Sequence, residues 1–298
     1  MSPRSGDGTL VRWARRDRVT VVTLDRPAKL NAITDDLMTE LVSVLQAVAE
    51  DDATELVVLE GAGRAFCAGF DISTGPPSPA TDGVRDGKDD PDAKRAYWQS
   101  HFELARQMLV AIWDLPQPVL AKIRGACLGG GMHLMLACDL AIASDDAYFG
   151  EPEVRFGGVP SFPLLPAVTG LRRANEIWMG GGTVSAPRAL EMGLVNRVAT
   201  AAELDEVVEG TARHLTLVPQ GTLRRVKAVS HQMGEVLGAR EALRIGRDAA
   251  IEALTERGPE ATAFDELVSR DGLKAGLAWL QERFVTGHAA GERAEDDI

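Results

Sequence analysis

The sequence predicts an α/β fold followed by a helical C-terminal region. Up to about residue 200, short β-branched or fully apolar runs alternate with segments whose apolar residues recur at helical spacing. This alternation is typical of parallel strands that are connected by helices. Beyond residue 200 the strand signals stop, and only amphipathic helical periodicity remains. We therefore expect a core over residues 1–200 and a helical region over residues 201–298.

The composition excludes several classes of protein. The 298 residues are 45% hydrophobic and 26% charged, and the formal net charge is -12. Such an acidic chain is not expected to bind nucleic acid, although a local basic patch can still bind an anionic ligand. Neither a signal-peptide pattern nor a run of about 18 apolar residues occurs, so we expect no membrane partner. Three cysteines without zinc-type Cys/His spacing indicate a metal-free, cytoplasmic protein with free thiols.

Three elements are expected before residue 62. The β-branched run over residues 18–24 predicts a strand, which the turn signal Asp25-Arg26-Pro27 ends. Thr34 is placed to cap a helix whose apolar residues continue at helical spacing to Val48. The fully apolar run over residues 56–59 predicts a buried strand.

The middle of the chain repeats the alternation. Residues 73–94 are rich in Pro, Gly, Asp and Ser and predict a mobile loop, because they have almost no large apolar residue to bury. Helical periodicity resumes at Tyr97 and continues to about Trp113. Two further strands are predicted at residues 119–123 and 140–143, with a helix from the Gly129 triplet to about Cys138 between them. In the C-terminal region, helices are predicted over 202–217, 221–233, 239–257 and 261–284.

Glycines mark two places where a ligand can approach the backbone. Gly69 lies among small residues after a predicted strand, and Gly129-Gly130-Gly131 open a predicted helix. Taken alone, the first site also fits a tight turn and the second also fits close helix–sheet packing. Together they indicate two backbone N–H groups that converge on one oxygen. Such an oxyanion hole stabilises a developing negative charge by about 3–4 kcal/mol per donor.

Motifs of other enzyme classes do not occur in the sequence. Gly61-Ala62-Gly63 follows a strand, but Phe66 stands where a dinucleotide fingerprint needs its third glycine. No phosphate-loop motif and no GxSxG nucleophile elbow is found. These absences argue against most nucleotide-binding and serine-hydrolase functions.

Five segments resemble the crotonase (enoyl-CoA hydratase/isomerase) superfamily in the correct order. They are residues 25–32 (DRPAKLNA), 65–72 (AFCAGFDI), 125–131 (GACLGGG), 137–143 (ACDLAIA) and 149–153 (FGEPE), with a further match at 186–198 (APRALEMGLVNRV). The similarity runs from about residue 18 to 200 and continues more weakly to Phe284. It implies a spiral of ββα units whose C-terminal helices pack homotrimers or hexamers. It also implies an acyl-CoA substrate, with no cofactor besides the coenzyme A of the thioester.

The resemblance also implies a set of site residues. The thioester oxygen would accept hydrogen bonds from the backbone N–H groups of Phe70 and Gly130. The coenzyme A nucleotide would lie near a second set of residues, namely Arg26, Lys29, Leu30, Ala68, Asp71 and Ile72.

The catalytic groups depart from the family pattern. Hydratases of the family typically use two carboxylates; Glu153 supplies one, but His133 stands at the position of the other. His133 can activate water or deliver a proton, orient the acyl group, or be a semi-buried histidine without a chemical role. We assign Glu153 and His133 as the catalytic residues. Residues 160–163 (PSFP) form a second departure, because a glycine-rich turn is usual there.

Other acidic residues receive structural interpretations. Glu151 is interpreted as a solvated or structural partner of Glu153. Asp71 and Asp139 are interpreted as capping or turn residues rather than catalysts.

Three functions stay open. Enoyl-CoA hydration ranks slightly ahead of isomerisation, for which Glu153 alone suffices as the base. Hydrolysis of an acyl-CoA thioester or of a carbon–carbon bond, which some relatives perform with histidine, is the second, and a catalytically inactive CoA-binding homologue is the third. Trp98, Phe102 and Trp113 hint at a bulky or aromatic acyl group, although core packing explains most residues of this kind.

Overall fold

The computed structural model describes residues 5–72 and 91–289, and it has two sheets. The larger sheet has the strand order β1-β2-β3-β4-β5-β7-β10, in which the last five strands run parallel and β1 and β2 are antiparallel. Its strands are β1 (Ser5–Asp7), β2 (Val11–Arg16), β3 (Val19–Leu24), β4 (Leu56–Gly61), β5 (Val119–Ile123), β7 (Leu140–Ser144) and β10 (Arg197–Ala199). The smaller sheet contains β6 (Ala126–Leu128), β8 (Tyr148–Gly150) and β9 (Thr183–Ser185).

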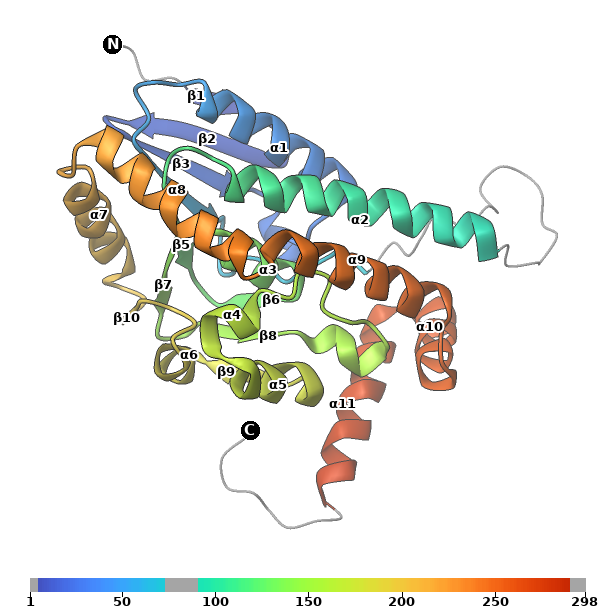
Figure 1. Ribbon diagram of the computed structural model, residues 1–298. Coiled ribbons are helices and arrows are strands. Elements are labelled where there is room, and N and C mark those ends of the chain that lie inside the picture. The colour runs from blue at the N-terminus through green and yellow to red at the C-terminus, as the bar shows by residue number, and fades with distance from the viewer. Residues whose placement is uncertain (1–4, 73–90, 290–298) are drawn as a thin grey trace.

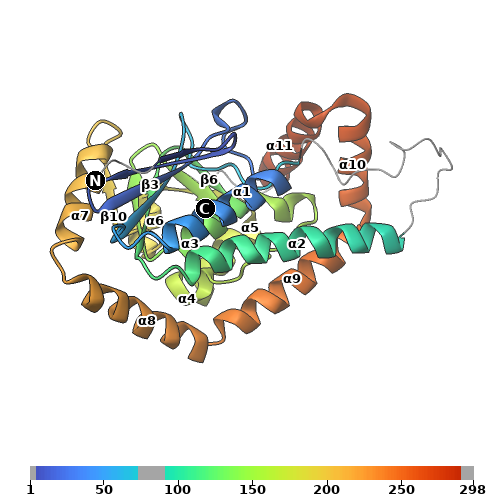
Figure 2. The ribbon, with the colours of Figure 1, turned by 90° about the horizontal axis from the view of Figure 1, so that it is seen from above.

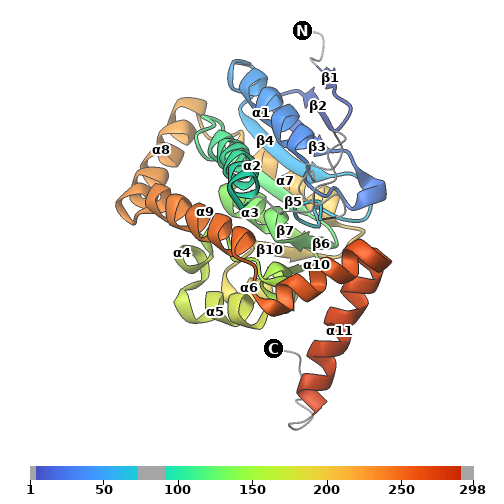
Figure 3. The same cartoon turned by 90° about the vertical axis from the view of Figure 1, so that its right-hand side faces the viewer.

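Helices cover both faces of the larger sheet (Figures 1 and 3). Val57 and Leu59 of β4 join the main core with α1 (Asp35–Ala49), α2 (Pro91–Trp113) and α3 (Gly130–Ala137). Leu56 and Val58 point the other way and pack against α7 (Leu204–Leu215). This alternation follows from the two-residue period of a strand and explains why a strand buried on both faces is apolar throughout. The expectation of an α/β fold is therefore confirmed.

The two sheets grow together as a spiral. The chain leaves β5 of the larger sheet, adds β6 to the smaller one and returns through α3 to β7, which is followed in the same way by β8. Two single bridges, Ile33 with Phe70 and Cys67 with Cys127, extend the second layer back to the turns after β3 and β4. Consecutive turns therefore lie side by side. This adjacency brings Phe70 of one turn next to Gly130 of the next.

Helix signals predicted most helices correctly. Thr34 caps α1 as expected, its hydroxyl accepting from the N–H of Leu37 at 3.2 Å. The sequence did not predict β2, nor the short helices α4 (Leu165–Thr169), α5 (Leu171–Gly180) and α6 (Ala186–Met192), which have little room for periodicity. Of the predicted loop, residues 73–90 lie outside the described residues, whereas 91–94 belong to α2.

The C-terminal region consists of α7 and four further helices: α8 (Gln220–Val236), α9 (Ala239–Thr255), α10 (Pro259–Asp271) and α11 (Leu273–Ala289). The single helix expected over 261–284 is wrong. Gly272, with φ of 86°, separates α10 from α11 in a conformation that side-chain-bearing residues rarely adopt. Within residues 5–72 and 91–289, no helix is long and apolar enough to cross a membrane.

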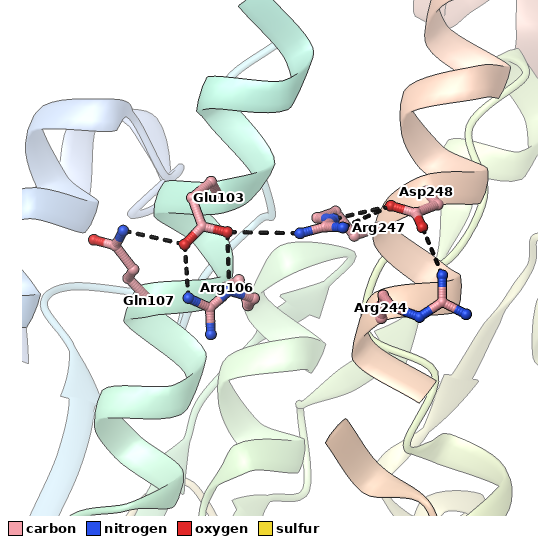
Figure 4. Close-up of polar contacts among 6 residues, drawn as sticks. All are labelled: Glu103, Arg106, Gln107, Arg244, Arg247 and Asp248. Atoms are coloured by element: carbon pink, nitrogen blue, oxygen red, sulfur yellow. Dashed lines mark hydrogen bonds and ion pairs between the residues drawn. The ribbon is translucent and has the colours of Figure 1, made fainter. Parts of the chain in front are cut away.

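The C-terminal helices are tied to the core. Figures 1 and 2 show α9 running alongside α2. A polar network joins the two helices (Figure 4). Its members are Glu103, Arg106 and Gln107 of α2 and Arg244, Arg247 and Asp248 of α9. Within this network, the ion pair that crosses from one helix to the other joins Arg247 Nη1 and Glu103 Oε2 at 3.7 Å. Both side chains are partly exposed, so this pair contributes little to the free energy of folding.

Candidate active site

The backbone N–H of Phe70 faces away from its strand partner. The N–H of Ile33 bonds to the carbonyl of Gly69, and the carbonyl of Ile33 accepts from the N–H of Asp71, both at 2.8 Å. Successive residues of a strand direct their N–H groups to opposite edges, so the N–H of Phe70 takes no part in this pairing. It faces the neighbouring turn of the spiral. A Cβ added to Gly69, whose φ is 97°, would lie 3.5 Å from the backbone nitrogen of Gly130.

The glycine triplet at the start of α3 supplies the second donor. Gly130 is the first residue of α3, and a helix leaves its first N–H groups without internal acceptors. A Cβ added to Gly130 would lie 2.9 Å from the ring of Phe70, and one added to Gly129 would lie 3.0 Å from Glu153 Oε2. At Gly131 it would lie 2.4 Å from a backbone carbonyl of the neighbouring turn. The glycines are thus required by close packing, and the same packing brings Phe70 to Gly130 and Glu153 to Gly129.

Glu153 lies beside this pair of donors. It belongs to the short 3₁₀ helix η3 (Pro152–Phe156), and its carboxylate packs against Gly129. Burial and, next, the negative charge of Glu151 raise the pKa of Glu153 to about 8, while His133 acts in the opposite direction. Glu153 is therefore largely protonated at neutral pH and can donate a proton.

His133 and Glu151 form a buried pair. The His133 Nε2 and Glu151 Oε2 atoms are 3.2 Å apart, and the side chains are 1% and 0% exposed. The second oxygen of Glu151 accepts from the indole N–H of Trp178 at 3.0 Å. Burial opposes protonation of His133, but the charge of Glu151 and its hydrogen bond outweigh burial and raise the pKa of His133. The interpretation of Glu151 as solvated is wrong, because it is the buried partner of His133.

The turn that departs from the family pattern also contacts His133. Ser161 Oγ lies 3.5 Å from His133 Nδ1, and the Phe162 ring contacts the imidazole edge-on, with centroids 6.0 Å apart. Ser161 and Phe162 are buried. Gly246 of α9 makes this position of the turn possible, because a Cβ there would lie 2.8 Å from the carbonyl oxygen of Ser161. The two departures from the family pattern are therefore one structural unit.

The cluster also offers donor atoms for a small cation. In the part of the chain that the structure describes, His133, Glu151 and Glu153 bring one donor atom each within 4.8 Å of one another. Two carboxylates and an imidazole are common ligands of divalent metals. The negative charge of Glu151 raises the pKa of both Glu153 and His133, so the cluster also favours the binding of protons. The expectation of a metal-free site stays a prediction.

The residues expected near coenzyme A form two linked pairs. Arg26 Nη2 contacts Asp71 Oδ2 at 3.0 Å, and the N–H of Ala68 bonds to the carbonyl of Leu30 at 2.9 Å. Asp71 therefore fixes the turn that carries Arg26. Of the remaining residues of this set, Lys29 and Ile72 are exposed.

Asp139 does more than cap or turn the chain. It accepts from the N–H of Val119 at 2.7 Å, forms an ion pair with Lys227 at 2.8 Å and is hydrogen-bonded to His231 Nε2 at 2.9 Å. Hydrogen bonds and charges from these partners lower the pKa of Asp139 against the opposing effect of burial, which is the largest single influence. Asp139 thus anchors α8 to the core.

A continuous series of aromatic rings leads from α2 to the site. The Phe70 ring contacts His101 at 5.2 Å, Phe102 at 6.2 Å and His133 at 6.5 Å between centroids. Trp98 contacts both His101 and Phe102. Trp113 is not part of this series, because it stacks on His231 of α8 at 4.1 Å.

Sequence reasoning missed three residues of the site. Ser161 had one signal, the departure from a glycine-rich turn. Glu151 lies in the matched segment 149–153, but the burial of Glu151 and of His101 had no signal, because an isolated Glu or His looks alike in a sequence whether it is buried or exposed. His101 Nδ1 lies 2.7 Å from Asp35 Oδ1, although burial, the largest influence, lowers the pKa of His101.

Comparisons with known proteins identify the family of the chain. The family model described as enoyl-CoA hydratase/isomerase matches residues 14–244. A probable enoyl-CoA hydratase of Mycobacterium leprae is 37% identical over 212 residues, which cover 70% of this chain and 69% of the relative. A 4-chlorobenzoyl coenzyme A dehalogenase of Arthrobacter sp is 34% identical over 210 residues, or 68% of this chain and 71% of the relative.

A solved structure extends the likeness to the fold. An enoyl-CoA hydratase/isomerase from Xanthobacter autotrophicus Py2 superimposes with a TM-score of 0.83 at 31% identity, covering 92% of this chain and 98% of that one. The chain is an enzyme of the acyl-CoA thioester-processing type, and it belongs to the enoyl-CoA hydratase/isomerase family of the crotonase superfamily.

Proposed function

We propose that the protein hydrates the C2–C3 double bond of an enoyl-CoA thioester. The observation that carries this proposal is the position of Glu153, whose raised pKa keeps its carboxyl protonated against Gly129, beside the two backbone donors. The N–H groups of Phe70 and Gly130 bind the thioester oxygen as it becomes an enolate. Two fixed donors of this kind stabilise the developing charge.

The two catalytic groups have different tasks in this proposal. Glu153 gives its proton to C2, while His133, held by Glu151, takes a proton from the water that attacks C3. One proton is gained and one is lost by the protein. The proton returns from His133 to Glu153 within the cluster, whose donor atoms lie within 4.8 Å of one another. Isomerisation needs only one of these groups, so the buried His133–Glu151 pair favours hydration.

Product analysis tests the proposal. The enzyme is incubated with crotonyl-CoA and, separately, with a 3-enoyl-CoA, and the products are identified by mass. We expect crotonyl-CoA to gain one water and His133→Ala to lose most of this activity. Movement of the double bond without uptake of water indicates isomerisation instead. Binding of both thioesters without conversion of either contradicts the proposal.

We also propose that the acyl group is aromatic or conjugated. The support is the series of rings around Phe70, because aromatic side chains favour edge-on and offset contacts with flat groups. The dehalogenase relative is named for a chlorobenzoyl thioester. We expect a higher kcat/KM with cinnamoyl-CoA than with crotonyl-CoA, and we expect Phe102→Ala to reduce the difference. An equal preference in the wild type contradicts this assignment.

We further propose that the protein is a cytoplasmic homotrimer, or a dimer of trimers, that assembles through residues 201–298. Apolar side chains on α8 and at the residue that follows it support an interface, since each is more than half exposed: Val226, Val229, Met233, Val236 and Leu237. The cysteines are free, which suits a reducing compartment.

A further inference from the structure

Three side chains of the site form a line of hydrogen bonds that ends in a hydroxyl. Glu151 contacts His133 Nε2 at 3.2 Å, and Ser161 Oγ lies 3.5 Å from His133 Nδ1. All three residues are buried. An ionised carboxylate only accepts hydrogen bonds. Neutral His133 therefore carries its ring proton on Nε2, the nitrogen that faces Glu151. The lone pair then lies on Nδ1, and the hydroxyl of Ser161 is the donor toward it.

A serine that donates to an imidazole whose other nitrogen is held by a carboxylate has the arrangement of an activated nucleophile. Such a set is recognised by its geometry rather than by its sequence order, and its contacts are often longer without substrate. The sequence offered no GxSxG elbow, which is why a serine nucleophile was not expected. Here the three side chains come from three separate parts of the spiral. His133 lies on α3, Glu151 follows β8, and Ser161 lies in the turn at 160–163.

The oxyanion donors lie next to this line. His133 is on the same helix as Gly130 and one turn farther along, so the two residues share a face of α3. The Phe70 ring lies close to both, 2.9 Å from a Cβ placed on Gly130 and 6.5 Å from the His133 ring centroid. A thioester held by the two N–H groups would thus lie next to His133.

We propose that Ser161 is a nucleophile and that the enzyme also hydrolyses acyl-CoA thioesters through an acyl-Ser161 intermediate. Ser161 Oγ bonds to the thioester carbonyl carbon while its proton passes to His133 Nδ1. The carbon–sulfur bond breaks, and coenzyme A leaves as the thiol with that proton. A water molecule, deprotonated by His133, then hydrolyses the ester, releases the carboxylic acid and restores the serine hydroxyl. This inference rests on the oxyanion hole of the proposed function, but it does not require Glu153 or a double bond.

Thioesters without an enoyl double bond separate the two activities, because the enzyme can release thiol from them but cannot hydrate them. Butyryl-CoA and benzoyl-CoA are the probes, thiol release is followed with a thiol reagent, and acid-quenched protein is examined by intact mass and peptide mapping. We expect steady thiol release by the wild type and an acyl adduct on residue 161. Ser161→Ala should lose at least ~10³-fold in thiol release and form no adduct. Ser161→Cys should keep the adduct, and Ser43→Ala, at an exposed serine of α1, should match the wild type.

Two results would overturn the inference. One is a wild type that releases no thiol from either probe and carries no adduct. The other is thiol release by folded Ser161→Ala at the wild-type rate. Hydration of crotonyl-CoA is measured in the same preparations. Hydration without thiol release overturns this inference and leaves the proposed function intact, whereas thiol release without hydration does the reverse.

Discussion

At the scale of single residues, the charge of Glu151 sets how the site titrates. Glu151 is 0% exposed, and its negative charge raises the pKa of both His133 and Glu153. Groups that interact this strongly titrate as a set, so a pH profile reports their joint behaviour. In the proposed reaction, the productive form has Glu153 protonated and His133 neutral.

The pH dependence of hydration follows from these directions. Activity should fall on the alkaline side as Glu153 loses its proton near its pKa of about 8, and on the acid side as His133 gains one. Removal of the Glu151 charge lowers both pKa values. We therefore expect Glu151→Gln to move both limbs of the kcat/KM profile to lower pH. An unchanged alkaline limb would show that Glu151 does not act on Glu153.

At the scale of elements, the C-terminal helices support the turns that carry the site. Gly246 of α9 packs on the backbone at Ser161, and Phe264 of α10 stacks on Phe156 of η3 with ring centroids 5.1 Å apart. Gly157, which follows η3, lies against Ala261 of α10. The turn at residues 160–163 and the 3₁₀ helix that carries Glu153 are thus both supported by helices beyond residue 200.

Gly246→Ala tests this support. Its Cβ would lie 2.6 Å from Pro163 Cδ and 2.8 Å from the carbonyl oxygen of Ser161, so the turn has to move. We expect a loss of about 1–3 kcal/mol in the free energy of unfolding and a lower kcat. Gly221→Ala in α8 is the matched control, since its Cβ meets only Arg225 Nη1 at 3.9 Å. It should be neutral or stabilise by up to about 1 kcal/mol. Equal effects of the two variants in urea unfolding would contradict the account.

The polar network of Figure 4 should contribute much less to the free energy of unfolding than the packing of Gly246 does. Arg247 approaches Glu103 at 3.7 Å, and the two side chains are 30% and 39% exposed. We expect Arg247→Ala to change the free energy of unfolding by less than about 1 kcal/mol, because exposed ion pairs are weak. A larger loss that disappears at high salt would show that ion pairs, rather than packing, hold α9 in place.

The elements also show what the sequence can predict. Thr34 and its apolar periodicity predicted α1, because a cap and an amphipathic face are local properties. The break at Gly272 was missed because the apolar spacing continues across it. The contact of His133 with Glu151 and Ser161 joins positions 18 and 28 residues away, and only the spiral brings them together. The family resemblance predicted roles for Glu153, His133 and the two N–H donors, but it gave no indication that Glu151 and Ser161 contact His133.

At the scale of the whole molecule, the exposed face of α8 predicts self-association. Val229 and Met233 are 63% and 56% exposed on the side of α8 that faces away from the core. We expect the wild type to have three or six times the chain mass of 31.9 kDa in size-exclusion chromatography with light scattering. Glutamate at both positions, Val229→Glu with Met233→Glu, should reduce that mass. Ala228→Glu, at an exposed position on another side of α8, should not. A monomeric wild type would contradict the assembly.

The central claim is that Glu153 delivers the proton in hydration of an enoyl-CoA, and its substitution tests that claim most directly. The measurement is kcat and KM for crotonyl-CoA with the wild type, Glu153→Gln and the exposed control Glu266→Gln. The account predicts a loss of at least ~10²-fold in kcat for Glu153→Gln with little change in KM, and wild-type values for the control. A folded Glu153→Gln enzyme that hydrates crotonyl-CoA at the wild-type rate would contradict it.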